Sequence, residues 1–219
     1  MKKHIVCFGD SNTHGYCAVP SDCGDGGARF NEEERWTCLL QKNLGEDYLV
    51  VEEGLSGRTT VFNDPLHEGL SGLDMITPVL MSHEPVDLLI IMLGTNDTKD
   101  RLGANAACIG IGMERLILKA KNTPCWNGGV PHILVIAPPH IGEGLYKIPE
   151  GEAMGCTCAE KSRGLAEKYK IVCANQGCMF LDAEGVAEFN SYDCMHLTKK
   201  GHAALAETLT DLISEFFKD

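Results

Sequence analysis

Short apolar runs alternate with longer segments of mixed polarity along this chain. The runs are rich in branched residues and cover positions 5–8, 48–51, 86–93, 132–137 and 179–181. Runs of this length and composition, bounded by turn-forming residues, are typical of buried strands. The pattern therefore predicts five β-strands.

The intervening segments carry apolar residues three or four positions apart, as one face of a helix requires. This spacing is clear at 34–44, 70–81, 104–121 and 199–217, and less regular at 152–175. Strands that alternate with helices form parallel sheets with helices on both faces. We therefore expect an α/β fold, a three-layer α/β/α sandwich.

Two further features bear on the organisation of the chain. After Asp87 the run 86–93 is apolar at every position, as a central strand covered on both faces must be. No repeat, low-complexity stretch or linker interrupts the sequence, so we expect residues 1–219 to form a single domain. The segments 18–31 and 138–151 are long for simple connections, and we expect them to carry substrate contacts.

Composition and charge exclude some classes of partner. Hydrophobic residues make up 44% and charged residues 23% of the chain, as in ordinary soluble proteins. The formal net charge is -12, and no stripe of Lys and Arg reverses it locally. We therefore expect no nucleic-acid partner and no membrane partner. The first apolar run is too short for a signal peptide or a membrane span.

Eleven cysteines are scattered along the chain without the paired spacing of a disulfide framework. This usage favours reduced thiols and a cytoplasmic location. A zinc site at Cys156, Cys158, Cys173 and Cys178 is the alternative, but these residues contain no C-x-x-C pair. We expect no metal.

Polar blocks follow the predicted strands, where open parallel sheets bind their ligands. Ser11 lies in a glycine-flanked turn after the first run, Gly57 follows the second, and Asn96 follows the third. Asp193 and His196 come just before the last predicted helix. Being three residues apart, they would share one side of a single helical turn.

These residues match the needs of acyl transfer to a serine. A base must take the hydroxyl proton, a carboxylate must orient that base, and donors must stabilise the oxyanion. We expect Ser11 to be the nucleophile, His196 the base and Asp193 the orienting carboxylate. The oxyanion donors would be the backbone N–H groups of Ser11 and Gly57 and the side-chain amide of Asn96.

Each residue also has a structural interpretation. Ser11 is placed to cap the first helix, Asp97 to cap the helix after the third strand, and Asp193 and His196 to be a solvated surface pair. His14 is an alternative base. A phosphate-binding or signalling module remains an alternative function, although no phosphate-binding glycine motif is present. Two further alternatives are a metallophosphoesterase, which lacks its Asp-x-His, and a binding module without catalysis.

Four blocks together resemble the SGNH, or GDSL-type, hydrolases: GDSN at Ser11, SGRTT at Gly57, GTND at Asn96 and DCMH at His196. The strings RWTCLL, EEGLSGRTT and DLLIIMLGTNDTK are similar to the bacterial arylesterase and acyltransferase branch. The resemblance implies a flavodoxin-like sandwich with five parallel strands. It also implies hydrolysis or transfer of a small acyl group from a small-molecule ester, without cofactor or metal.

The first block departs from the family pattern, because Asn12 and His14 stand where related esterases often have larger apolar or aromatic residues. We expect the acyl or alcohol pocket to differ there. Acyl length, the alcohol released and the preferred acceptor stay open. Members of the resembling branch form oligomers, which leaves a homo-oligomer open for this chain.

Overall fold

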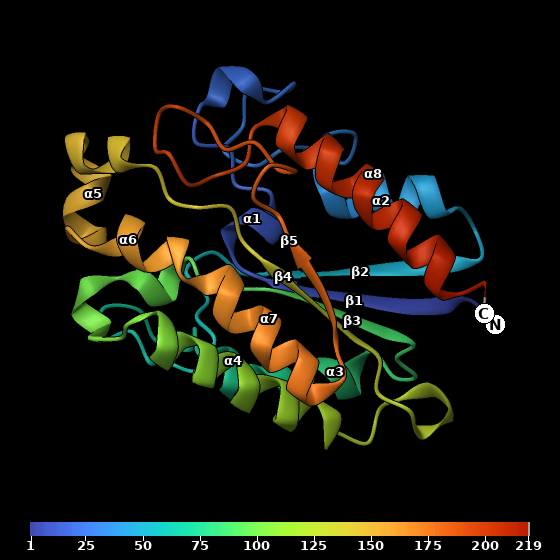
Figure 1. The fold of residues 1–219 in the computed structure, drawn as a ribbon. Coiled ribbons are helices and arrows are strands. Elements are labelled where there is room, and N and C mark those ends of the chain that lie inside the picture. The colour runs from blue at the N-terminus through green and yellow to red at the C-terminus, as the bar shows by residue number, and fades with distance from the viewer. Residues whose placement is uncertain (219) are drawn as a thin grey trace.

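A computed structural model, which describes residues 1–218, contains a five-stranded parallel sheet in the order β2-β1-β3-β4-β5 (Figure 1). The strands are β1 (Lys3–Gly9), β2 (Tyr48–Gly54), β3 (Leu88–Met92), β4 (Ile133–Ala137) and β5 (Met179–Asp182). In the register, Ile5 of β1 lies opposite Val50 of β2 and Leu88 of β3. The predicted fold class is confirmed, and this strand order is the flavodoxin-like one.

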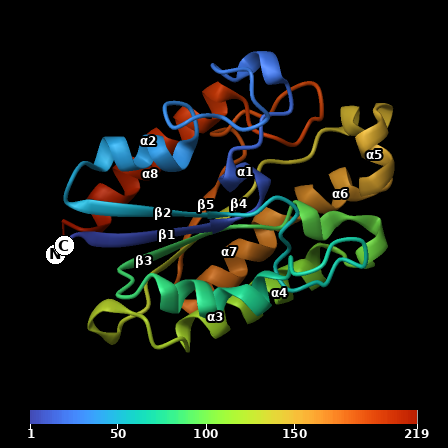
Figure 2. The same cartoon turned by 180° about the vertical axis from the view of Figure 1, so that it is seen from behind.

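Helices cover both faces of the sheet (Figures 1 and 2). They are α1 (Ser11–His14), α2 (Trp36–Leu44), α3 (Gly72–Ser82), α4 (Ala106–Lys121), α5 (Pro149–Met154), α6 (Cys158–Arg163), α7 (Leu165–Gln176) and α8 (Lys199–Phe216). Helices α2 and α8 lie on one face, and α3, α4 and α7 lie on the other. The molecule therefore has the three layers that the sequence predicts.

Alternate residues of each strand enter different cores because successive side chains point to opposite faces. In β1, Val6 and Phe8 pack with residues of α3, α4 and α7, whereas Ile5 and Cys7 pack with α2 and α8. All four side chains are fully buried. Burial on both faces explains why the strands appear in the sequence as continuous apolar runs.

The helix expected over 152–175 is wrong as one element, because it is broken into parts of α5, then α6 and α7. The first break is at Gly155, whose φ of 97° lies in the region that favours glycine. Beyond it, the Asp100 carboxylate accepts hydrogen bonds from the Cys156 backbone N–H at 2.7 Å and from the Lys161 ammonium at 2.7 Å. This tertiary contact with Asp100 stabilises a new helix start that periodicity does not reveal.

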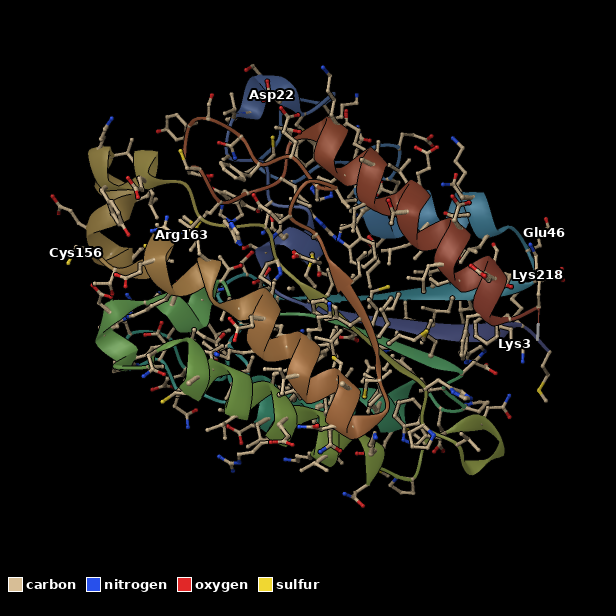
Figure 3. All side chains as sticks on the ribbon, in the orientation of Figure 1. Lys3, Asp22, Glu46, Cys156, Arg163 and Lys218 are labelled. Atoms are coloured by element: carbon tan, nitrogen blue, oxygen red, sulfur yellow. The ribbon has the colours of Figure 1, made fainter. Side chains whose placement is uncertain are left out.

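The two ends of the sheet differ. The carboxyl ends of the strands point toward α1, α5 and α6, and the labelled side chains of Cys156 and Arg163 mark that end (Figure 3). Lys3 and Lys218 mark the opposite end, where the Lys3 ammonium lies 5.2 Å from the centroid of the Phe217 ring. Within residues 1–218, no helix has the length and apolar character needed to cross a membrane.

Candidate active site

Ser11 is the first residue of α1, directly after β1. Asp10 caps this helix, since its carboxylate accepts a hydrogen bond from the Asn12 backbone N–H at 3.0 Å. The turn is tight: a Cβ on Gly9 would lie 2.9 Å from the Met92 carbonyl oxygen and closer still to Thr13. Ser11 therefore lies at the carboxyl edge of the sheet with its hydroxyl free of the capping role.

Hydrogen bonds join Ser11, His196 and Asp193 in a line. Nε2 of His196 lies 2.8 Å from the Ser11 hydroxyl, and Nδ1 lies 2.6 Å from a carboxylate oxygen of Asp193. Burial raises the pKa of Asp193, but hydrogen bonds from the His196 ring and from backbone N–H groups outweigh this and hold the pKa at about 2. Asp193 is therefore a carboxylate at neutral pH and accepts from Nδ1 of His196, while Nε2 is the ring nitrogen that faces Ser11.

The segment that carries Asp193 and His196 is a turn, so the helical turn that we expected there is wrong. Cys194 has a φ of 58°, the one positive φ of a non-glycine residue in the described part of the chain. This conformation directs the backbone N–H groups of Met195 and His196 toward one oxygen of Asp193, each at 3.1 Å. The other oxygen is left for the imidazole.

Asn190 stabilises the same turn, and the sequence did not identify it as a site residue. Its side-chain amide donates to Asp193 at 2.9 Å and to the His196 carbonyl at 2.8 Å, and its side-chain oxygen accepts from the Asp193 N–H at 2.9 Å. Asn190 is buried. An asparagine three residues before an aspartate is ordinary turn chemistry, so nothing local distinguishes this one.

Gly57 and Asn96 come from the loops after β2 and β3. Gly57 has a φ of 88°, and a Cβ there would lie 2.7 Å from Leu70. The Asn96 amide donates to the Arg58 carbonyl at 3.2 Å and approaches a carboxylate oxygen of Asp10 at 3.4 Å. Both residues line the same pocket as Ser11 and His196. The structure thus brings all five predicted site residues to one place.

Two buried carboxyl groups, those of Asp10 and Asp97, are next in sequence to Ser11 and Asn96 of this pocket. Asp97 does not cap a helix, because its carboxylate accepts hydrogen bonds from the Thr60 backbone N–H at 2.9 Å and from the Thr60 hydroxyl at 2.5 Å. Burial raises the pKa of Asp97 to about 6, with the charge of Asp10 adding to the effect. Burial likewise raises the pKa of Asp10 to about 6, against the opposing hydrogen bond from Asn12. These groups support the loops that hold Asn96 and Gly57.

The pocket over Ser11 has a volume of about 200 Å³. Tyr16, Glu150, Met154 and Met195 add to its lining. The 138–151 segment thus contributes Glu150, as expected of a substrate-contacting loop, whereas no residue of 18–31 lines the pocket. A larger cavity of about 480 Å³ lies beside Lys3 and Phe217, at the other end of the sheet.

The expectation that Asn12 and His14 alter the pocket is wrong, because neither residue lines it. Asn12 is buried and turns toward the segment around His196. His14 ends α1 beside Gly15. The histidine that reaches the Ser11 hydroxyl is His196.

The four cysteines weighed as zinc ligands do not meet at one site, although Cys178 packs against the same core as Cys173. Cys156 is exposed, Cys158 packs in a small cluster with Ile141 and Leu145, and Cys173 belongs to the core under α7. Over residues 1–218, no group of three or more His, Cys, Asp or Glu side chains is arranged to hold a metal ion.

Comparison with known proteins identifies the family. The sequence profile of the GDSL-like lipase/acylhydrolase family matches residues 7–204. The chain therefore belongs to this family. No curated protein matches the chain at a significant level.

Solved structures resemble the chain over almost its full length. The aryl esterase of M. smegmatis is 34% identical with a TM-score of 0.86, covering 97% of this chain and 99% of that one. Est24, a carbohydrate acetylesterase from Sinorhizobium meliloti, is 33% identical with a TM-score of 0.87, covering 98% and 100%. Family and neighbours agree that the chain is a carboxylic ester hydrolase, and they do not favour a phosphate-binding or signalling module.

Proposed function

We propose that this chain hydrolyses esters of short acyl groups through a covalent acyl-enzyme on Ser11. His196 is the general base and acid, and Asp193 orients the imidazole and stabilises its charged form. The backbone N–H groups of Ser11 and Gly57 and the side-chain amide of Asn96 bind the oxyanion. The observation that carries the proposal is the line of hydrogen bonds from Ser11 to His196 at 2.8 Å and on to Asp193 at 2.6 Å.

In the first half of the reaction, the Ser11 oxygen attacks the ester carbonyl carbon while its proton passes to Nε2 of His196. The carbonyl oxygen becomes an oxyanion, which the donors from Gly57 and Asn96 stabilise more strongly than the neutral substrate. The intermediate then collapses. The bond to the alcohol oxygen breaks, and His196 returns the proton to the departing alcohol.

In the second half, His196 removes a proton from a water molecule, which attacks the acyl carbon on Ser11. A second oxyanion forms and collapses, and the Ser11 oxygen regains its proton as the carboxylic acid leaves. An alcohol in place of water would give acyl transfer by the same steps. Asp193 stays ionised throughout, as its pKa of about 2 requires.

The size of the pocket supports a short acyl group, because about 200 Å³ is less than drug-sized ligand sites usually offer. The similar proteins act on aryl esters and on acetylated carbohydrates, as their names state. We therefore propose acetate esters of phenols or sugars as the first substrates to examine.

The test is a panel of p-nitrophenyl esters from acetate to octanoate, together with acetylated sugars, assayed with the wild-type protein and with Ser11→Ala. We expect the acetate ester to be cleaved fastest and Ser11→Ala to lose at least about 10³-fold in kcat. Ser82→Ala is the matched control, because Ser82 is exposed on α3 and bonds only the Pro78 carbonyl.

An organophosphorus ester should also label the protein at Ser11, as mass spectrometry of peptides would show. Hydrolysis that survives in Ser11→Ala, or an adduct on another serine, would refute the acyl-enzyme on Ser11. Absence of activity on every ester of the panel would refute the proposed substrate class.

A further inference from the structure

The bond between Ser11 and His196 joins segments 185 residues apart in the chain. Its length depends on how the turn around His196 lies against α1. The hydrogen bonds of Asn190 and Asp193 stabilise that turn internally, because all of their partners here lie within residues 190–196. They cannot by themselves set its position relative to Ser11. Contacts from outside the turn must do so. They include the bond from the Gly142 N–H to the Cys194 carbonyl at 2.8 Å and the Tyr16 ring, whose centroid lies 4.5 Å from that of His196.

The hydrogen bonds that hold both sides of His196 come from Asn12, the residue after the proposed nucleophile. Its side-chain nitrogen donates to the Met195 carbonyl at 3.2 Å, and its side-chain oxygen accepts from the Leu197 N–H at 3.0 Å. The two backbone groups flank His196 on either side. One amide thus bonds the residue before the base and the residue after it, as a neighbouring strand would.

Asn12 is itself rigidly held. Its backbone N–H donates to the Asp10 carboxylate at 3.0 Å, and its carbonyl accepts from the Trp36 indole N–H at 3.1 Å. Both Asn12 and Leu197 are 1% exposed. Water therefore has little access to the Leu197 N–H, and a buried backbone donor that loses its partner is costly.

We propose that Asn12 is a positioning residue that holds the His196 imidazole at hydrogen-bond distance from Ser11 by bonding both neighbours of His196. Asn12 touches neither the pocket nor the reacting atoms, so its effect passes through the base. The inference rests on the proposed function, in which His196 is the base. It assigns the Asn of the GDSN block to alignment of the catalytic groups and not to the substrate pocket.

The first test is Asn12→Leu, which removes both hydrogen bonds while keeping a side chain of similar size. A small displacement of the base is enough to slow attack, so we expect kcat to fall about 10- to 100-fold with KM nearly unchanged. The rate at which an organophosphorus ester labels Ser11 should fall by the same factor. Asn105→Ala is the control, because Asn105 caps α4 through the Cys108 N–H and its loss destabilises the fold away from the pocket.

Asn12→Asp is the second variant, and it keeps the test decisive if Asn12→Leu does not fold. Its carboxylate keeps an acceptor for Leu197, loses the donor to Met195 and adds a negative charge near His196, besides those of Asp193 and Asp10. We expect a lower kcat and a pH midpoint of kcat/KM above that of the wild type, since a nearby anion favours the imidazolium. If Asn12 only stabilised the fold, Asn12→Asp would lower the folded fraction without moving the pH midpoint of kcat/KM.

The proposal is overturned if a folded Asn12→Leu keeps kcat and the labelling rate within twofold of the wild type, or if Asn12→Asp leaves both kcat and the pH midpoint unchanged. This failure differs from failure of the proposed function. In the latter case Ser11→Ala would stay active, or the label would attach elsewhere, whatever residue occupied position 12.

Discussion

A carboxylate oxygen of Asp10 lies 3.4 Å from the side-chain nitrogen of Asn96, and both residues are buried. The same nitrogen donates to the Arg58 carbonyl at 3.2 Å. The bond to Arg58 fixes the plane of the Asn96 amide at the pocket that Ser11 and Gly57 share, and the longer contact with Asp10 leaves its second N–H to turn to an oxyanion. This contact links Asp10, the residue before the proposed nucleophile Ser11, to Asn96, a proposed oxyanion donor.

Asn96→Ala should therefore reduce kcat while leaving KM and the fold almost unchanged. Negative charge grows on the carbonyl oxygen only as the acyl carbon becomes tetrahedral, so the lost donor matters mainly in the transition state. The expected loss is about 10²- to 10³-fold in kcat, or about 3 to 4 kcal/mol. Steady-state kinetics with p-nitrophenyl acetate measures it.

The control for this prediction is Asn122→Ala, because Asn122 lies at the end of α4 and bonds only the Leu118 carbonyl with its side chain. If Asn96→Ala retains near-normal kcat while circular dichroism and melting show an intact fold, Asn96 has no part in stabilising the oxyanion.

Gly57→Ala should reduce both stability and kcat. Its φ of 88° is unfavourable for alanine, at a cost of about 1 to 2 kcal/mol, and the new Cβ would lie 2.7 Å from Leu70. Any shift that relieves this contact also moves the Gly57 N–H away from the oxyanion. Urea unfolding and kcat on the same substrate separate the two effects.

Gly177→Ala is matched to this variant, since Gly177 has a φ of 61° at the end of α7 and a Cβ there would meet nothing within 4 Å. We expect Gly177→Ala to lose stability but to keep its kcat. Equal kcat values for the two variants would contradict the role assigned to the Gly57 N–H.

Asp10→Asn should change how stability depends on pH. Because the pKa of Asp10 is raised from 3.8 to about 6 in the folded protein, the native state keeps this proton between pH 4 and 6 while the unfolded chain loses it. The contribution of Asp10 to stability therefore falls as pH rises through this window, at about 1.4 kcal/mol per pKa unit. Asp10→Asn has no carboxyl group here, so it lacks this pH-dependent contribution to stability.

The measurement is the free energy of unfolding in urea for wild type and Asp10→Asn at intervals from pH 4 to 7.5. We expect the free energy of unfolding of Asp10→Asn to rise relative to that of the wild type as pH rises. The neighbouring charges of His196, Arg58, Lys99 and Asp97 are present in both proteins. A difference that stays constant across the range would show that the pKa of Asp10 is not raised by folding.

Cys194→Val should reduce kcat more than Cys194→Ala or Cys194→Gly. The φ of 58° at this position is especially unfavourable for a β-branched residue, and it is the conformation that directs two N–H groups to Asp193. Glycine adopts it freely. Alanine retains the Cβ and reports what loss of the sulfur alone does to packing.

Kinetics of the three Cys194 variants, with urea unfolding beside them, provides the comparison. Equal kcat for the valine and alanine variants would mean that the geometry of the turn does not set the position of the Asp193 carboxylate.

The local pattern of apolar and polar residues was sufficient to predict the layers of the fold. Apolar runs such as 86–93 identify strands, because a strand buried on both faces needs apolar side chains at every position. The regular helix spacing near 104–121 and 199–217 predicts α4 and α8 to within two residues. Periodicity is a local property, so it can be read without knowing what each face contacts.

The order of the polar blocks also located the candidate site. Parallel strands bring their carboxyl ends to one edge, so residues that follow different strands, such as Ser11 and Asn96, must approach one another. Their proximity is a consequence of topology. Side-chain chemistry then suggested their roles.

Tertiary structure alone decided how these groups are held. The bonds from Asn12 to the neighbours of His196 join positions that are 183 and 185 apart, and no periodic signal connects them. The break beyond Gly155 likewise depends on a distant carboxylate, because Asp100 accepts the N–H of Cys156 from 56 positions away. Such contacts follow from packing of distant segments, whereas hydrophobic periodicity encodes only which face of each segment is buried.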